Sequence, residues 1–330
     1  MKAVLPERVR AHLARLPAAV ETAWYMDTDS CVKGVAGAEI LWLDFGVREV
    51  DHVIDAGSDL KWVTALATGV DGWPLDLFQK RGLVLTNGAG LGAIPISEYV
   101  VLGLLAGLKG AAALVRAQDR REWLKRPPTL EELYGKRALI YGYGSIGHAI
   151  GERLRAFGVA VIGVRRRPGL PTSGEVNPGR EAAAGGRGQG EPGVIASTEW
   201  ESKLPQTDLL ILAVPLTGAT RALVGQPQLA ALPQGAWVVN IARGGLIDET
   251  ALVAALKSGH LGGAYLDVTE TEPLPPTSEL WSLPNVILTP HTSWATHHLL
   301  ERGAAIFLDN LNRYLRGEPL RNVVDLTSGY

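Results

Sequence analysis

Three side chains in the second half of this 330-residue chain are of types that together could reduce a carbonyl group beside a carboxylate. Arg243 carries a permanently charged, forked guanidinium, which suits binding a carboxylate and polarising a neighbouring ketone. An imidazole, here that of His291, ordinarily titrates near neutral pH and suits proton donation to a developing alkoxide. Glu272 suits a third role, because a carboxylate beside an imidazolium favours the charged ring. Each residue taken singly has a structural explanation, but together they predict the reduction of a 2-oxo acid.

A glycine-rich turn supplies the expected site for the hydride donor. The segment 137–147 (RALIYGYGSIG) reads as a strand that passes into a helix, and a second strand is expected at 159–164. The first glycine permits the tight turn, the second lets the backbone approach a pyrophosphate, and the third lets the helix pack on the strand. This context makes the motif a strong indication of dinucleotide binding. The residues expected at the phosphates are Gly142, Gly144, Ser145, Ile146 and Gly147.

The choice between the two nicotinamide cofactors depends on the end of that second strand. Enzymes that use NAD usually place an acidic residue there, which binds the ribose 2′-hydroxyl. This chain has Arg165, Arg166 and Arg167 instead, and guanidinium groups bind a 2′-phosphate in a forked geometry. A solvated basic turn is the alternative explanation. The sequence therefore favours NADP, with NAD possible.

Short apolar runs that alternate with helical stretches predict an α/β fold. Strands are expected at 138–141, 159–164, 209–214, 237–241, 263–268 and 286–288, and earlier in the chain at 39–43, 62–65 and 83–86. This alternation is typical of βαβ units around parallel sheets that are buried on both faces. We therefore expect two Rossmann-like domains, each with a doubly wound parallel sheet.

Two long helices are expected to link these domains, one at 97–116 and one at 295–316. The predicted substrate-binding domain comprises residues 1–94 and is completed by 292–330, and the predicted dinucleotide-binding domain comprises 95–291. The segment 168–193 is dense in Gly and Pro, so we expect an exposed loop there. A surface insertion without function is the simpler explanation, and a role in cofactor binding is the alternative.

Composition excludes several classes of protein. Lys and Arg number 32 and Asp and Glu 34, so a nucleic-acid-binding surface is not expected. The apolar run at 99–108 is too short to span a membrane, and the N-terminal residues do not resemble a secretory signal. Cys31 is the only cysteine, which excludes an intrachain disulfide and cysteine-rich zinc sites. We expect a cytoplasmic protein with no metal site.

The ordered set of motifs resembles the D-isomer-specific 2-hydroxyacid dehydrogenase family over nearly the whole chain. The matching segments are 142–147, 215–217, 239–244, 266–268, 272–274, and Pro290-His291 with Ser293. Any one motif could arise by chance, whereas the set in this order and spacing is typical of the family. The resemblance implies an NAD(P)-dependent enzyme that forms D-2-hydroxy acids. Glyoxylate and hydroxypyruvate reductases are the most similar subgroup.

The resemblance also assigns individual roles. It implies that Arg243, Glu272 and His291 form the catalytic trio, and that the backbone N–H groups around Thr68 and Gly69 bind the substrate carboxylate. Further cofactor contacts are implied for Asp267, which would lie near the nicotinamide carboxamide, and for the backbone of Val214, Pro215, Ile241 and Ala242. Family members are typically homodimers through their nucleotide domains, with Trp123 in the arm that crosses to the partner.

Some features depart from the family pattern or leave an alternative open. Arg165 stands where an aspartate is common, and Trp294 stands where a small residue is frequent, so the substrate pocket is expected to differ. We expect no regulatory domain of the kind found in long phosphoglycerate dehydrogenases. The alternative function is a dinucleotide-sensing corepressor of the same fold. It is disfavoured because the sequence shows no additional partner-binding tail.

Overall fold

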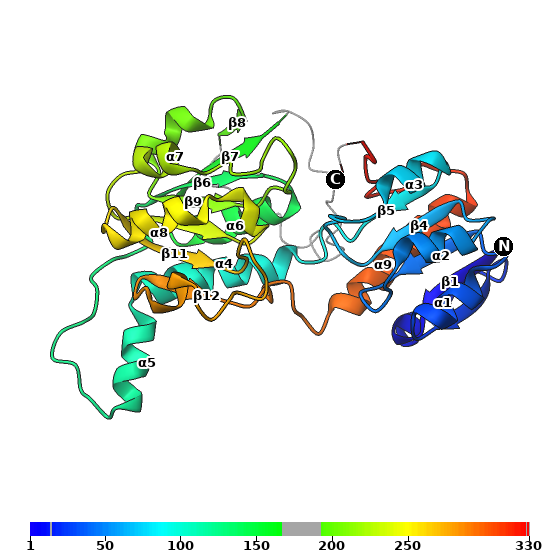
Figure 1. Ribbon diagram of the computed structural model, residues 1–330, viewed down its shortest axis with the longest axis horizontal. Coiled ribbons are helices and arrows are strands. Elements are labelled where there is room, and N and C mark those ends of the chain that lie inside the picture. Colours follow the sequence, from blue (N-terminus) through cyan, green and yellow to red (C-terminus); the bar gives the residue numbers. More distant parts are fainter. Residues whose placement is uncertain (14, 167–192, 328, 330) are drawn as a thin grey trace. The chain divides into compact units, whose positions relative to one another are not determined.

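The computed structural model describes residues 1–13, 15–166, 193–327 and 329. The chain divides into two units, Met1–Gly92 with Ala295–Tyr330, and Ala93–Trp294, each built around its own parallel sheet (Figure 1). These boundaries fall a few residues from those expected at 94/95 and 291/292. The predicted loop at 168–193 lies, apart from Gly193, outside the described residues, as does Arg167.

The first unit contains a five-stranded parallel sheet in the order β2-β1-β3-β4-β5. Its strands are β1 (Lys2–Pro6), β2 (Glu21–Tyr25), β3 (Ile40–Leu43), β4 (Trp62–Ala65) and β5 (Val84–Thr86). Helices α1 (Thr28–Val35), α2 (Val50–Ala56) and α3 (Leu75–Lys80) cover one face, where Val4 and Leu41 are buried. Helix α9 (Leu299–Leu315) covers the other face, where Phe307 stacks on Trp42 at 4.9 Å and on Trp62 at 5.4 Å.

The strands predicted at 39–43, 62–65 and 83–86 correspond to β3, β4 and β5, whereas β1 and β2 were not predicted. β2 pairs with β1 along its whole length, from Lys2 opposite Glu21 to Pro6 opposite Tyr25. Because β2 is an edge strand whose residues are mostly half-exposed, it lacks the continuous apolar run that marks a buried strand.

The second unit contains a seven-stranded parallel sheet in the order β12-β11-β10-β9-β6-β7-β8. Its strands are β6 (Arg137–Tyr141), β7 (Ala160–Arg165), β8 (Val194–Ala196), β9 (Leu209–Leu212), β10 (Ala236–Asn240), β11 (Leu261–Leu266) and β12 (Val286–Leu288). Helices α4 (Ala93–Leu108) and α6 (Ser145–Ala156) pack on one face, and α7 (Gln226–Ala231) and α8 (Glu249–Lys257) on the other. This arrangement confirms the predicted α/β class with doubly wound parallel sheets. The described residues also form four short 3₁₀ helices: η1 (Glu7–His12), η2 (Trp200–Gln206), η3 (Gly244–Leu246) and η4 (Glu279–Ser282).

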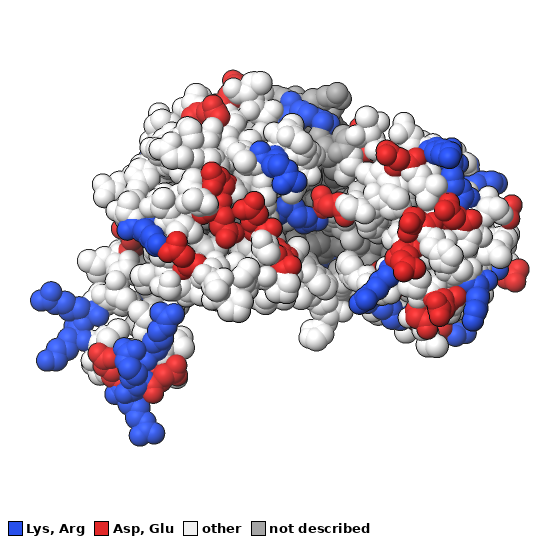
Figure 2. Space-filling model, viewed as in Figure 1, with Lys and Arg blue, Asp and Glu red and all other residues white. Residues whose placement is uncertain are grey.

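The single long helix predicted at 97–116 is wrong. The chain forms α4 and then α5 (Ala111–Asp119), and the two axes differ by 68°. Gly110 separates them with a left-handed backbone (φ +64°), a conformation that glycine adopts at little cost. In Figure 1, α5 extends away from the sheet of its own unit, and Figure 2 shows Lys and Arg side chains gathered on this projecting segment.

Among the described residues, no single helix has the length and apolar composition to cross a membrane. Helices α4 and α5 meet that test only as this bent pair.

The carboxyl ends of parallel strands meet at one edge of a sheet, and this edge is where ligands bind in open α/β folds. In the second unit, β6 leads directly into Gly142 and β9 is followed by Val214. The neighbouring strands β10, β11 and β12 lead to Arg243, Asp267 and His291. The fold therefore gathers the predicted chemistry of this unit along a single edge.

Candidate active site

His291 and Glu272 form a close pair at this edge. Nδ1 of His291 lies 2.7 Å from Oε2 of Glu272, and both side chains are 38% exposed. The other carboxylate oxygen of Glu272 accepts a hydrogen bond from the backbone N–H of Thr269 at 3.2 Å. An ionised carboxylate at this distance orients the imidazole with Nδ1–H as donor, so Nε2 is the ring nitrogen that can exchange a proton with a substrate.

Arg243 lies just beyond β10 and is held by a buried asparagine. The side-chain amide of Asn240 donates to the Arg243 carbonyl at 2.8 Å, and its oxygen accepts from the N–H of Ala242 at 3.1 Å. The Arg243 guanidinium itself donates to the Ala242 carbonyl at 2.7 Å. Next along the chain, a Cβ added to Gly244 would lie 1.9 Å from the backbone of Thr269. The loop that carries Arg243 and the loop that carries Glu272 are therefore in backbone contact.

The glycine turn after β6 has the shape required to bind a pyrophosphate. Gly142 has a φ of +101°, and a Cβ there would lie 2.4 Å from the carbonyl oxygen of Ala213. A Cβ on Gly147 would lie 2.3 Å from the Gly142 carbonyl oxygen, so the start of α6 packs directly on the turn. A Cβ on Gly144 would meet nothing within 4 Å. This turn with open space at the N-terminus of α6 fits a dinucleotide, whose phosphates the helix N–H groups can bind.

Arg165, at the end of β7, folds back over this turn. Its Nε donates to the carbonyl of Tyr143, and its guanidinium carbon lies 5.9 Å from the centre of the Tyr143 ring. The Tyr143 ring is buried, and its hydroxyl oxygen accepts a hydrogen bond from Arg155 at 2.6 Å. Burial raises the pKa of the Tyr143 phenol, so the ring stays neutral. Arg166 is exposed next to Arg165.

The remaining predicted contacts lie at strand ends in both units. Val214 and Pro215 follow β9, and the Pro215 carbonyl accepts a hydrogen bond from Thr220 at 2.8 Å. In the first unit, the loop after β4 carries Thr68 and Gly69. The carbonyl of Thr68 accepts from the Asn87 amide at 2.7 Å, and its hydroxyl donates to the Gly88 carbonyl at 3.1 Å.

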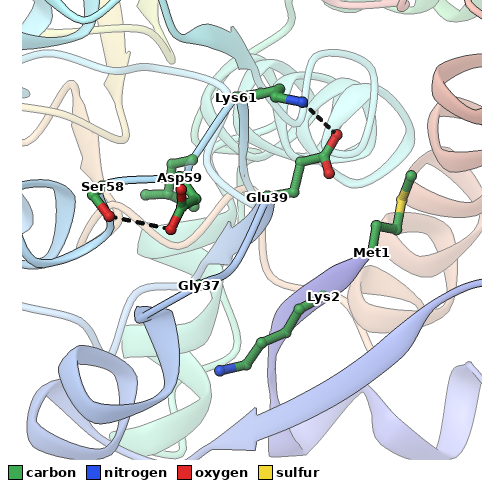
Figure 3. A pocket seen from close by; sticks show the side chains of 8 residues that line it. Met1, Lys2, Gly37, Glu39, Ser58, Asp59 and Lys61 are labelled. Carbon is green, nitrogen blue, oxygen red and sulfur yellow. Dashed lines mark hydrogen bonds and ion pairs between the residues drawn. The ribbon is translucent and has the colours of Figure 1, made fainter.

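A cavity of about 430 Å³ lies in the first unit (Figure 3), at the opposite edge of that unit's sheet from the loop that carries Thr68 and Gly69. Its lining residues are Met1, Lys2, Gly37, Glu39, Ser58, Asp59, Leu60 and Lys61, which lie at or before the amino-terminal ends of β1, β3 and β4. Several of its polar groups pair with each other, as Lys61 does with Glu39 at 3.2 Å and Ser58 with Asp59 at 3.2 Å.

Within the described part of the chain, no group of three or more His, Cys, Asp or Glu side chains is placed to hold a metal ion.

Three further residues shape this site through hydrogen bonds that the sequence did not predict. Asn240 fixes the turn before Arg243, Ser293 bonds to Asp267, and the indole N–H of Trp294 donates to the His291 carbonyl at 2.9 Å. A polar residue at the end of an otherwise apolar strand could have identified Asn240. The other two act through a turn whose geometry is not evident from the sequence.

The fold and the glycine turn define a dinucleotide-binding α/β protein. The family model for the NAD-binding domain of D-isomer specific 2-hydroxyacid dehydrogenases matches residues 101–293. The chain belongs to the D-isomer specific 2-hydroxyacid dehydrogenase family.

The relatives that match along most of this chain carry different enzyme names. The chain is 30% identical to a glycerate dehydrogenase of Methylorubrum extorquens, covering 92% of this chain and 90% of that one. It is 31% identical to a D-3-phosphoglycerate dehydrogenase of Methanocaldococcus jannaschii over 93% of this chain, but it spans only about half (55%) of that protein. An NADPH-dependent glyoxylate/hydroxypyruvate reductase from Sinorhizobium meliloti, solved with NADP and sulfate, superimposes with a TM-score of 0.80 at 26% identity, covering both chains fully.

Proposed function

We propose that this enzyme reduces a small 2-oxo acid of the glyoxylate or hydroxypyruvate type to the D-2-hydroxy acid, with NADPH as the preferred cofactor. The observation that carries the proposal is the 2.7 Å contact between His291 and Glu272 on the sheet edge where β10 also presents Arg243. The similarity to the Sinorhizobium meliloti reductase and to the Methylorubrum extorquens glycerate dehydrogenase supports a small acid as substrate.

Arg243, Glu272 and His291 have different roles in the proposed carbonyl reduction. Arg243 binds the substrate carboxylate and polarises the ketone, because its guanidinium offers two parallel N–H donors. The Thr68–Gly69 backbone is proposed to bind the same carboxylate. When bound, the reduced nicotinamide supplies the hydride that adds to the carbonyl carbon. His291 gives its Nε2 proton to the carbonyl oxygen as this oxygen gains charge, and Glu272 stabilises the imidazolium before the transfer.

The same edge offers contacts for the whole dinucleotide. Gly142, Gly144 and Gly147, with the N–H groups of Ser145 and Ile146 at the start of α6, are proposed to bind the pyrophosphate. The backbone after β9 and β10 is proposed to line the cofactor farther along the edge. These residues are Val214, Pro215, Ile241 and Ala242.

A direct assay tests the proposed reaction. NADPH absorbance is followed after adding glyoxylate, hydroxypyruvate, a phosphorylated 2-oxo acid or a bulky 2-oxo acid, and the product's configuration is determined. We expect turnover with the two small acids and D configuration where the product is chiral. Tight NADPH binding without turnover on any substrate would instead support the corepressor-like alternative. Preference for the phosphorylated acid would reassign the substrate class.

NADPH is expected to be used more efficiently than NADH, because Arg165 and Arg166 stand where the ribose 2′-phosphate is expected. A charge-assisted hydrogen bond of this kind contributes roughly 1.5–3 kcal/mol, or roughly ten-fold to over a hundred-fold in affinity. The double variant Arg165→Asp, Arg166→Ala should lose the preference while retaining activity with NADH. Equal kcat/KM for the two cofactors in the unmodified enzyme would contradict this prediction.

We also propose a homodimer formed through the segment that contains α5. Trp123 is 94% exposed, and Leu130 and Tyr134 are also exposed on this segment. Large apolar side chains exposed together on one segment commonly mark a protein interface. Sedimentation equilibrium measures the mass, and a monomer at micromolar concentration would refute the proposal.

A further inference from the structure

Asp267 is buried directly behind the His291 turn. It follows β11, is 1% exposed, and its carboxylate accepts hydrogen bonds from residues of the turn 289–293. Oδ1 accepts from the Thr289 hydroxyl at 2.6 Å and from the Thr292 N–H at 3.0 Å. Oδ2 accepts from the N–H of Ser293 at 3.1 Å and from its hydroxyl. These four donors come from a single turn of chain.

The backbone of the same residue also binds the turn. The N–H of His291 donates to the Asp267 carbonyl at 2.8 Å and to the Thr289 carbonyl at 3.0 Å. On the other side of the peptide, the His291 carbonyl accepts from the Trp294 indole at 2.9 Å. His291 is therefore held through both of its main-chain polar groups.

This restraint holds His291 in a conformation that it would rarely adopt by itself. Its φ is +52°, in the left-handed region that non-glycine residues seldom occupy. Such a backbone persists only where the surrounding structure determines it. The hydrogen bonds from the turn to Asp267 hold the backbone in this conformation. They also fix the direction in which the imidazole projects from the backbone.

The buried carboxylate and the turn depend on each other. A carboxylate removed from water is costly unless donors surround it, and here the turn provides them. A carboxylate has about four acceptor positions, which is the number that these donors require. The network extends to the adjacent strand, because the Thr289 hydroxyl also lies 3.1 Å from the Tyr265 hydroxyl. Burial raises the pKa of Tyr265, so its phenol remains a neutral hydrogen-bonding partner.

We propose that Asp267 is a positioning residue, which fixes the turn 289–293 so that Nδ1 of His291 meets Glu272. This role differs from the nicotinamide contact that the family resemblance implies for Asp267. Its effect on turnover rests on the proposed function of His291. The geometry can be tested without turnover.

The first experiment replaces Asp267 with asparagine and compares it with Asp208→Asn. Asp208 is a matched control, because it accepts hydrogen bonds from Arg137 at the opposite edge of the same sheet, at 2.8 Å from the backbone N–H. Displacing a catalytic group by about 1 Å can cost roughly 10²-fold in rate. We therefore expect Asp267→Asn to lower kcat by about 10²-fold, while the NADPH dissociation constant stays within about two-fold and the control stays near the unmodified rate. Weakened NADPH binding with kcat retained would assign Asp267 to the cofactor and overturn the proposal.

A double-mutant cycle separates positioning from general loss of structure. If Asp267 acts through the imidazole, Asp267→Asn should cost little more than about two-fold in the His291→Ala background, because coupled residues are not additive. A residue that only supports the fold, or that contacts the cofactor, would lower the rate by the same factor in both backgrounds. Equal factors would overturn the proposal.

Crystal structures of the variants test the geometry of the turn without relying on activity. We expect Asp267→Asn to lose the left-handed backbone at His291 or the 2.7 Å contact with Glu272. Should that variant fail to fold, Ser293→Ala removes one donor alone and should displace the turn less, with Ser282→Ala as its control. If the unmodified enzyme reduces no 2-oxo acid, the proposed function is wrong. The crystal structures of the variants still test whether Asp267 positions His291. An unchanged turn and contact in the folded variant would overturn it.

Discussion

Replacing His291 with alanine is expected to lower kcat/KM for 2-oxo acid reduction by about 10²- to 10⁴-fold at every pH, the usual contribution of a general acid. The proton that neutralises the alkoxide would then have to come from water, which is a far weaker acid than an imidazolium. NADPH binding should survive, because the proposed dinucleotide contacts lie on the glycine turn and on neighbouring strand ends.

The substitution Glu272→Gln tests the pair of His291 and Glu272, whereas His291→Ala tests the proton donor alone. The amide can still lie near Nδ1, but it no longer offers the negative charge that favours an imidazolium. The alkaline limb of the profile of kcat/KM against pH should therefore move to lower pH, with modest loss at acidic pH.

The chain offers a matched control for this experiment. His298 and Glu301 form a similar pair in the first unit, with Nδ1 of His298 3.0 Å from Oε2 of Glu301, but both side chains are well exposed. His298→Ala and Glu301→Gln should leave both the rate and the pH profile unchanged. An alkaline limb that does not move in Glu272→Gln would remove Glu272 from the mechanism.

Arg243→Ala is expected to cost at least on the order of 10²–10³-fold in kcat/KM, the scale measured when a donor to a developing negative charge is removed. The loss combines the binding of the substrate carboxylate with the polarisation of the ketone. Arg243→Lys should recover only a fraction, since an ammonium is a point charge that cannot reproduce the guanidinium fork. The NADPH dissociation constant should change little in either variant.

Arg137→Ala provides the control for the loss of an arginine. Arg137 pairs with Asp208 at 3.2 Å at the opposite edge of the sheet, so its loss should affect stability slightly and the rate hardly at all. Near-normal kcat/KM in Arg243→Ala would show that another cation binds the substrate. The roles proposed above would then need to be reassigned.

Much of the fold could be predicted because its strands are buried on both faces. A strand covered on two sides reads as a continuous apolar run, and the run predicted at 209–214 contains β9, whose four residues are all buried. The glycine turn was equally predictable, since Gly142 and Gly147 stand where any Cβ would collide with backbone. The edge strand β2 was missed because burial does not impose an apolar pattern on it.

The break between α4 and α5 was missed for a different reason. A run of apolar and helix-favouring residues predicts a continuous helix, and isolated glycines such as Gly103, Gly107 and Gly110 are often tolerated within one. Only the packed structure shows that Gly110 takes a left-handed backbone there and turns the chain by 68°. Local propensity could not choose between these outcomes, because the choice depends on what each half of the segment packs against.

At the site, the order of residues along the chain is enough to show which side chains are present and which strands they follow. The types and order of Arg243, Glu272 and His291 predict the chemistry, and parallel strands must place their ends along one edge. How these groups meet depends on the folded chain. The imidazole reaches Glu272 because the buried carboxylate of Asp267, just after β11, is surrounded by donors from the turn after β12, which holds His291 at a φ of +52°. The hydrogen bonds to this carboxylate join residues 22 to 26 positions apart, and no local pattern in the sequence encodes them.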